Sequence, residues 1–180
     1  MTTYFKKFTK VQLSMVMIAV ICIGIYFYYS SHGSLPFFKE VVTVKEQQTE
    51  DGNTVIKVKD TSTDVANEFP MDMSEDAVLD AIHKMSHQKV ESDQKWGAIP
   101  LTPERVNRLI AVVENNQSNY VHADLYLIIL ERWAKNDFSH VVQDHNDIWG
   151  LQGGTIGKAY GISTPAEEEA FIKDNFKIAQ

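Results

Sequence analysis

The chain has 180 residues, which is enough for one ordinary domain with an appendage and too few for a multidomain enzyme. Apolar residues make up 44% of it and charged residues 23%, so wholesale disorder is excluded. Its single cysteine, Cys22, excludes an internal disulfide framework and a cysteine-based zinc site. The net charge of −7 repels phosphate backbones, and no basic cluster offsets it, so we expect no nucleic-acid partner.

An uncharged apolar run over residues 11–29 dominates the N-terminal region. A helix of this length spans about 28 Å, close to the roughly 30 Å hydrocarbon layer of a membrane. Lys6, Lys7 and Lys10 precede the run, and such positive charge favours the cytoplasmic side. We therefore predict that residues 1–30 form a cytoplasmic tip and a single transmembrane helix in the lipid bilayer of the cell membrane, with the remaining chain extracellular. A cleaved signal peptide is the alternative, although its apolar region is usually only about 7–15 residues.

Residues 31–69 are predicted to form an extracytoplasmic tether. Two β-branched runs, at 41–44 and 54–58, flank the turn dipeptide Asp51-Gly52, as in a hairpin. An isolated two-stranded hairpin is marginally stable in water, so a flexible tether is an equal alternative. Both interpretations stay open at this point.

Residues 70–180 contain the helix-capping residues and apolar segments that are typical of a compact helical domain. Ser74, Thr102 and Thr164 are suited to cap helices, and Thr164 begins a capping box with Glu167. The segment 120–136 is apolar over more than half of its circumference, which is typical of a central helix. We therefore predict an all-α fold, a bundle of about five helices joined by short loops.

Four side chains have the right types for metal chemistry. Asp80, His83 and His87 follow one another at helical spacing on the side opposite the apolar stripe of the first helix. Two imidazoles one turn apart plus a carboxylate could hold zinc or another divalent ion in three positions and leave one open for water, and His145 from the fourth helix is a further candidate ligand. The competing interpretation is an ordinary solvated helix face, and the sequence lacks the glutamate of the His-Glu-x-x-His metalloprotease motif.

His145 falls on the apolar face of its own helix, which allows two further interpretations. It is either a core histidine held by a backbone carbonyl or by an amide such as that of Gln152, or a base beside Asp144 or Asp147.

Two glycine-containing loops are candidate ligand sites. The segment 153–158 fails the spacing of a phosphate-binding loop, so we expect no nucleotide partner. In the segment 96–100, Trp96 is expected to fold onto the body of the domain.

Three motifs give the chain a family resemblance: His-Lys-Met-Ser-His-Gln-Lys at 83–89, Lys-Trp-Gly-Ala-Ile-Pro at 95–100, and Asp-His-Asn-Asp-Ile-Trp-Gly-Leu-Gln-Gly-Gly-Thr-Ile-Gly-Lys-Ala at 144–159. From about 69 to 176 the chain resembles a family of uncharacterised, membrane-anchored or exported proteins of Bacillus-like bacteria. The resemblance implies export from a Gram-positive cell and a small helical body. It supplies no reaction, cofactor or catalytic residue.

Two functional hypotheses follow from the sequence. The first is a membrane-anchored extracytoplasmic binding or scaffolding module for another envelope protein or for the cell wall, because no catalytic set converges in the sequence. The second is a metal-dependent hydrolytic activity that uses Asp80, His83 and His87 with His145 or Asp144.

Overall fold

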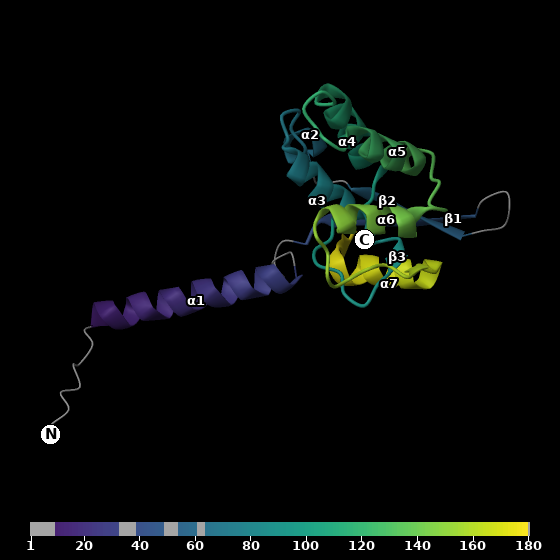
Figure 1. The fold of residues 1–180 in the computed structure, drawn as a ribbon. Helices are drawn as coiled ribbons and strands as arrows, with labels where there is room; N and C mark the ends of the chain where they lie inside the picture. Colours follow the sequence, from purple (N-terminus) through teal and green to yellow (C-terminus); the bar gives the residue numbers. More distant parts are fainter. Residues whose placement is uncertain (1–9, 33–38, 49–53, 61–63, 180) are drawn as a thin grey trace, which may run out of the picture. The chain divides into compact units, whose positions relative to one another are not determined.

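The computed structural model describes residues 10–32, 39–48, 54–60 and 64–179 of the chain. The chain divides into two compact units, Met1–Phe38 and Lys39–Gln180, and each is described by itself. Figure 1 shows their helices and strands.

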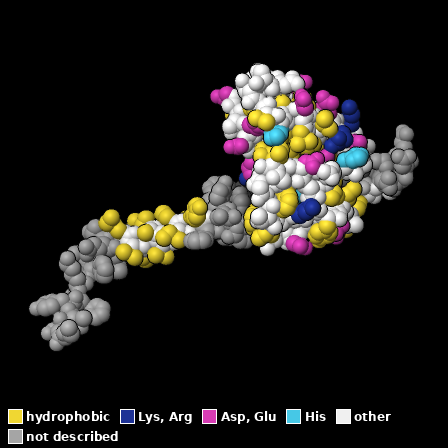
Figure 2. Space-filling model, viewed as in Figure 1, with side chains coloured by type: hydrophobic (Ala, Val, Ile, Leu, Met, Phe, Trp, Pro, Cys, Tyr) yellow, Lys and Arg dark blue, Asp and Glu magenta, His cyan; other side chains and the backbone are white. Residues whose placement is uncertain are grey.

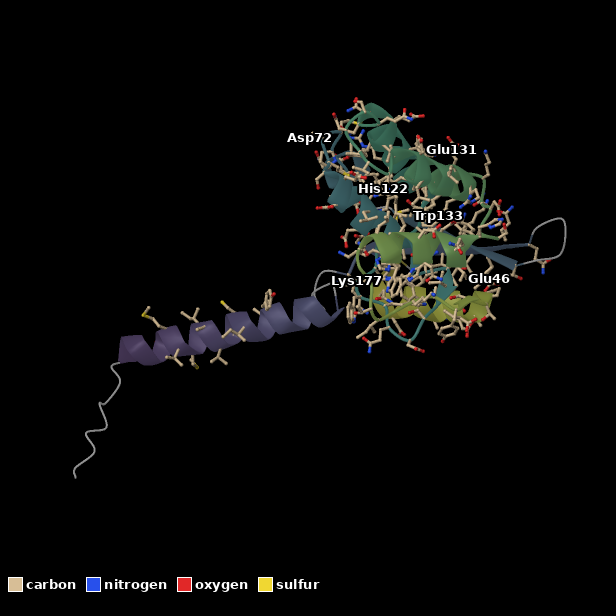
Figure 3. The ribbon with its side chains drawn as sticks, viewed as in Figure 1. Glu46, Asp72, His122, Glu131, Trp133 and Lys177 are labelled. Atoms are coloured by element: carbon tan, nitrogen blue, oxygen red, sulfur yellow. The ribbon has the colours of Figure 1, made fainter. Side chains whose placement is uncertain are left out.

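The first unit contains one helix, α1 (Lys10–His32). Apolar side chains surround its described part, as Figures 2 and 3 show. In the part of the chain that the structure describes, however, no helix has both the length and the apolar character needed to cross a membrane. The predicted transmembrane helix, the single-pass location in the cell membrane and the extracellular placement of the domain are corrected accordingly.

The second unit begins with an antiparallel hairpin, β1 (Val41–Gln48) and β2 (Thr54–Asp60). A third strand, β5 (Lys177–Ile178), pairs parallel to β1 and gives the sheet order β2-β1-β5. Val42, Ile56 and Val58 are buried on one face of this sheet, as the two-residue period of a strand dictates, and they pack with Ile172 and Phe176. The hairpin therefore does not stand alone, because a third strand and a helix cover it.

Six helices follow in the described part of the second unit: α2 (Val65–Glu68), α3 (Glu75–Ser86), α4 (Pro103–Asn115), α5 (Ala123–Ala134), α6 (Val141–Leu151) and α7 (Pro165–Asn175). A second sheet consists of β3 (Val90–Glu91) and β4 (Gly161–Ile162), which pair antiparallel. The expected caps are confirmed, since Ser74, Thr102 and Thr164 accept backbone hydrogen bonds at the starts of α3, α4 and α7.

The prediction of an all-α fold with five helices is therefore wrong, since the second unit combines helices with two small sheets. The strands β3, β4 and β5 have two residues each, which is too short to produce an alternating pattern in the sequence.

The apolar core brings the helices together in a fixed arrangement. Leu109 of α4 and Tyr126 and Leu130 of α5 are fully buried, and each such side chain stabilises the fold by about 1.5–3 kcal/mol. Trp133 of α5, labelled in Figure 3, donates a hydrogen bond of 3.0 Å to Asp144 of α6. In Figure 1, α6 crosses the middle of the domain, and it packs against α3.

A buried arginine joins the hairpin to the helices. Arg105 of α4 is fully buried, and its guanidinium lies 2.6 Å from Glu40, which precedes β1, and 2.9 Å from Glu68 at the end of α2. These charge-assisted contacts give three separate segments one fixed register.

Replacing this arginine is expected to destabilise the domain strongly. Arg105→Ala leaves two carboxylates without their cation and should lower the free energy of unfolding by about 3 kcal/mol, as measured by urea denaturation. The matched control is Lys173→Ala, which removes an exposed helical ion pair with Glu169 and should change stability by less than about 1 kcal/mol. Equal effects of the two substitutions would contradict the structural role of Arg105.

Candidate metal centre

The contact between α3 and α6 brings three histidines together. His83 lies in α3, His87 forms its C-terminal cap, and His145 lies in the middle of α6. One ring nitrogen of each lies within 4.8 Å of those of the other two, an arrangement that could hold a metal ion. The ring centroids are 4.7 Å apart for His83 and His87, 4.6 Å for His83 and His145, and 5.5 Å for His87 and His145. These three residues are called the histidine cluster below.

The cluster is buried on one side and reachable on the other. His145 is fully buried and His87 is 2% exposed, whereas His83 is only partly buried. The polar side of α3 is therefore not a solvated face at this end, because α6 covers it. Of the three rings, His83 is therefore the one that solvent reaches.

Hydrogen bonds fix the orientation of the two rings on α3. Nδ1 of His87 lies 2.8 Å from the carbonyl oxygen of Gly97. Since a carbonyl oxygen only accepts, Nδ1 carries the proton and Nε2 keeps its lone pair. Nδ1 of His83 likewise donates to Oε1 of Gln152, which leaves its Nε2 unprotonated. Such a second hydrogen bond is the usual way in which a protein orients a metal-binding imidazole.

His145 uses its two nitrogens in the opposite sense. Its Nε2 donates to the carbonyl oxygen of Gly157 over 3.1 Å, so the lone pair of the neutral ring lies on Nδ1. Nδ1 is 2.8 Å from the hydroxyl oxygen of Ser86, which also lies 2.6 Å from the carbonyl oxygen of His83. The hydroxyl has one proton and two acceptors in reach. A cation on Nδ1 would therefore leave this hydroxyl bonded to His83.

Burial keeps the three rings neutral. Desolvation, together with the neighbouring His83, lowers the pKa of His87 to about 3 and that of His145 to about 4. Desolvation also lowers the pKa of His83. Neutral imidazole is the form that binds metals, so at pH 7 the cluster offers three lone pairs without competition from protons.

The two carbonyls that hold the buried rings come from glycines with left-handed backbone conformation. Gly97 has a φ of 80° and Gly157 a φ of 88°, a region that side-chain-bearing residues rarely adopt. A Cβ on Gly157 would also lie 2.7 Å from the backbone oxygen of Gln94. The hydroxyl of Ser92 lies 2.8 Å from the Gly157 oxygen and 2.9 Å from the Gln94 oxygen, which ties the two loops together.

A pocket of about 230 Å³ opens beside the cluster, with His83 in its lining. Trp149 of α6 forms another part of the lining, and its indole donates a 2.8 Å hydrogen bond to the carbonyl oxygen of Ile156. A Cβ on Gly154 would lie 2.2 Å from this ring, so only glycine allows the loop to pass it so closely. Trp96 lines the same pocket and is 52% exposed, which corrects the expectation that it folds onto the body of the domain.

The other candidate residues lie apart from the cluster or have other partners. Asp80 forms an ion pair of 2.7 Å with Lys84 and is half exposed. Asp144 is buried and bonded to Arg132 and Trp133, which argues against a role as partner of a histidine base. Asp147 accepts a hydrogen bond from Gln143. The three histidines named from the sequence lie close together. Of the two partners considered for His145, the structure has the backbone carbonyl, that of Gly157, while Gln152 bonds to His83. Sequence reasoning did not single out Ser86.

One protein-family model matches the chain, over residues 82–173, and its description is a family of unknown function, DUF6241. The matched range contains the whole histidine cluster. No curated protein and no solved structure matches the chain. The expected membership of an uncharacterised family is thus supported, while the family description specifies neither a membrane anchor nor a source organism.

The buried neutral histidines make the stability of the metal-free protein sensitive to pH. In the unfolded chain a histidine gains a proton as pH falls below about 6.5, whereas His87 and His145 resist it down to about 3 and about 4. Their contribution to stability is therefore complete above pH 6.5 and is lost as pH falls through this window. From pH 7 to pH 5 each should remove about 2 kcal/mol from the free energy of unfolding, measured with a chelator present.

The variant His87→Gln isolates one of these contributions. It keeps a donor for the Gly97 carbonyl but does not titrate, so the loss between pH 7 and pH 5 should shrink by about 2 kcal/mol. The exposed His140 provides the control, since His140→Gln should leave the loss as in the wild type. An unchanged loss in His87→Gln would show that this ring is not held neutral by burial.

The glycine at position 157 gives a second test of the site. Gly157→Ala should destabilise the fold by about 1–3 kcal/mol, because the positive φ and the contact with the Gln94 oxygen both oppose a Cβ. Gly150→Ala is the matched control within α6: its Cβ meets nothing within 4 Å and should stabilise the helix by up to about 1 kcal/mol. Chemical unfolding of both variants measures the change in the free energy of unfolding, which should be negative for Gly157→Ala and positive for Gly150→Ala. No change in Gly157→Ala would be inconsistent with the geometry.

Proposed function

The chain belongs to this family of unknown function, and we propose that its domain binds one divalent transition-metal ion of the zinc type through His83, His87 and His145. The observation that carries the proposal is the convergence of one ring nitrogen from each of three imidazoles, and each imidazole also has a ring nitrogen hydrogen-bonded to an oxygen. Imidazole is a good ligand for zinc and for the neighbouring divalent metals.

The distances support a site that closes on its ion. Zinc bonds of about 2.0–2.1 Å place tetrahedral ligand atoms about 3.4 Å apart. The three nitrogens lie within 4.8 Å of one another, so small side-chain rotations suffice to bring them to that spacing. Two of the rings sit on α3 and the third on α6, so the ion would also hold these helices together.

Three protein ligands leave a fourth position for water or for another molecule, as in catalytic zinc sites. The hydrolytic activity considered from the sequence needs in addition a base at that position. Asp80 and Asp144, the carboxylates considered for the metal-dependent site, both have other partners, Lys84 and Arg132. Metal binding is therefore the function that the geometry favours, and hydrolysis stays a prediction. No contact described in the domain bears on the role as a binding module for an envelope protein or for the cell wall, so this role also stays a prediction.

Metal titration of the full chain tests the proposal. Isothermal titration with Zn²⁺ should give one site per chain, and Co²⁺ should develop the visible absorption of a four-coordinate complex. His83→Ala should weaken binding at least tenfold, because it removes one ligand at the partly exposed position where the fold tolerates the change. His140→Ala, which removes an exposed histidine outside the cluster, should bind as the wild type does. Binding that is absent, or that is equal in the two variants, would reject the proposed site.

A further inference from the structure

Two tryptophans and the partly exposed histidine line one pocket, and this pocket is the accessible side of the cluster. His83 belongs both to the cluster and to the pocket lining, while His87 and His145 are buried. A molecule in the pocket would therefore contact the cluster at His83, the residue of the cluster that is not buried. The pocket and the histidine cluster share this one side chain.

The charge of the site selects the kind of donor. Three neutral imidazoles leave the full double positive charge of a bound ion uncompensated. Charged side chains of both signs lie near the rings. Lys84 and Lys95 disfavour positive charge on the histidines, whereas the carboxylate of Asp80 favours positive charge on His83. Asp80 is itself paired with Lys84, so an anionic oxygen donor fits the open position best.

The residues that line the pocket indicate what the remainder of the ligand, beyond its anionic oxygen, should be. The indoles of Trp96 and Trp149 and the side chain of Ile156 present apolar surface, and Trp96 and Ile156 are each 52% exposed. Exposed aromatic surface of this kind commonly marks a binding site. Gln152 and Thr155 add polar groups at the same place, suited to the second oxygen of a carboxylate. The volume of about 230 Å³ is below the usual range for larger ligands, so the occupant is small.

We propose that this pocket binds a small carboxylate with an apolar ring or side chain, whose carboxylate coordinates the metal ion of the histidine cluster while its apolar part packs against Trp96 and Trp149. This proposal rests on the proposed metal binding. It adds the chemical class of the ligand, which the three histidines alone do not specify.

The test uses the full chain loaded with Co²⁺, and benzoate as the probe. Uptake of Co²⁺ is measured first, so a failure of metal binding is seen separately from a failure of the pocket. Benzoate should change the visible spectrum of the bound Co²⁺ and bind at least tenfold more tightly than to the metal-free chain. Acetate, which lacks the ring, and benzyl alcohol, which lacks the carboxylate, should each bind at least tenfold more weakly than benzoate.

A pair of aromatic variants locates the binding site. Trp96→Ala should leave Co²⁺ uptake unchanged and weaken benzoate roughly tenfold, with little change for acetate. Tyr160→Ala removes another exposed aromatic side chain, which is 64% exposed and outside the pocket lining, and should bind benzoate as the wild type does. Three outcomes would overturn the proposal while leaving the metal site intact, provided that the chain takes up Co²⁺. Benzoate could leave the Co²⁺ spectrum unchanged, it could bind the metal-free chain equally well, or it could bind no more tightly than acetate. Equal effects of Trp96→Ala and Tyr160→Ala would overturn it as well.

Discussion

The packing of α3 against α6 determines the chemistry of the domain. It places three imidazoles in an interior from which water is largely removed, and this desolvation disfavours the protonated rings. A buried neutral imidazole still needs partners for its polar atoms, and the protein satisfies one nitrogen on each ring with an oxygen. The same contact thus prepares the lone pairs and keeps protons from occupying them.

Buried polar contacts beyond the cluster give the rest of the domain its register. Directly after α3, Lys89 forms an ion pair of 2.6 Å with Glu168 of α7, and both side chains are buried. Gln88 bonds to the same carboxylate over 2.7 Å and accepts from the backbone of Leu101 over 3.2 Å. Arg105 connects the hairpin in a similar way. Such contacts demand particular partners and directions, whereas apolar packing alone tolerates sliding.

The sequence predicted those features that depend on short-range chemistry. The capping residues Ser74 and Thr164 could be identified because a cap requires only a few neighbouring residues. The burial of His87 could not, because the periodicity of α3 marks its polar side but not the second helix that covers it. Strands of two residues leave no period to detect. The hydrogen-bond partners of the buried imidazoles could not be predicted either. Gly97 and Gly157 contribute backbone carbonyls, which every residue type has.

The short sheet of β3 and β4 holds together the two loops that orient the buried histidines. In β3 and β4, Glu91 is paired with Gly161, and the loops that carry Gly97 and Gly157 leave from this single ladder. Ser92, the residue directly after Glu91, joins the same two loops through its hydroxyl. The carbonyls that hold both interior rings therefore depend on one short ladder and one hydroxyl, and we expect a change that shifts either loop to disturb the alignment of both imidazoles.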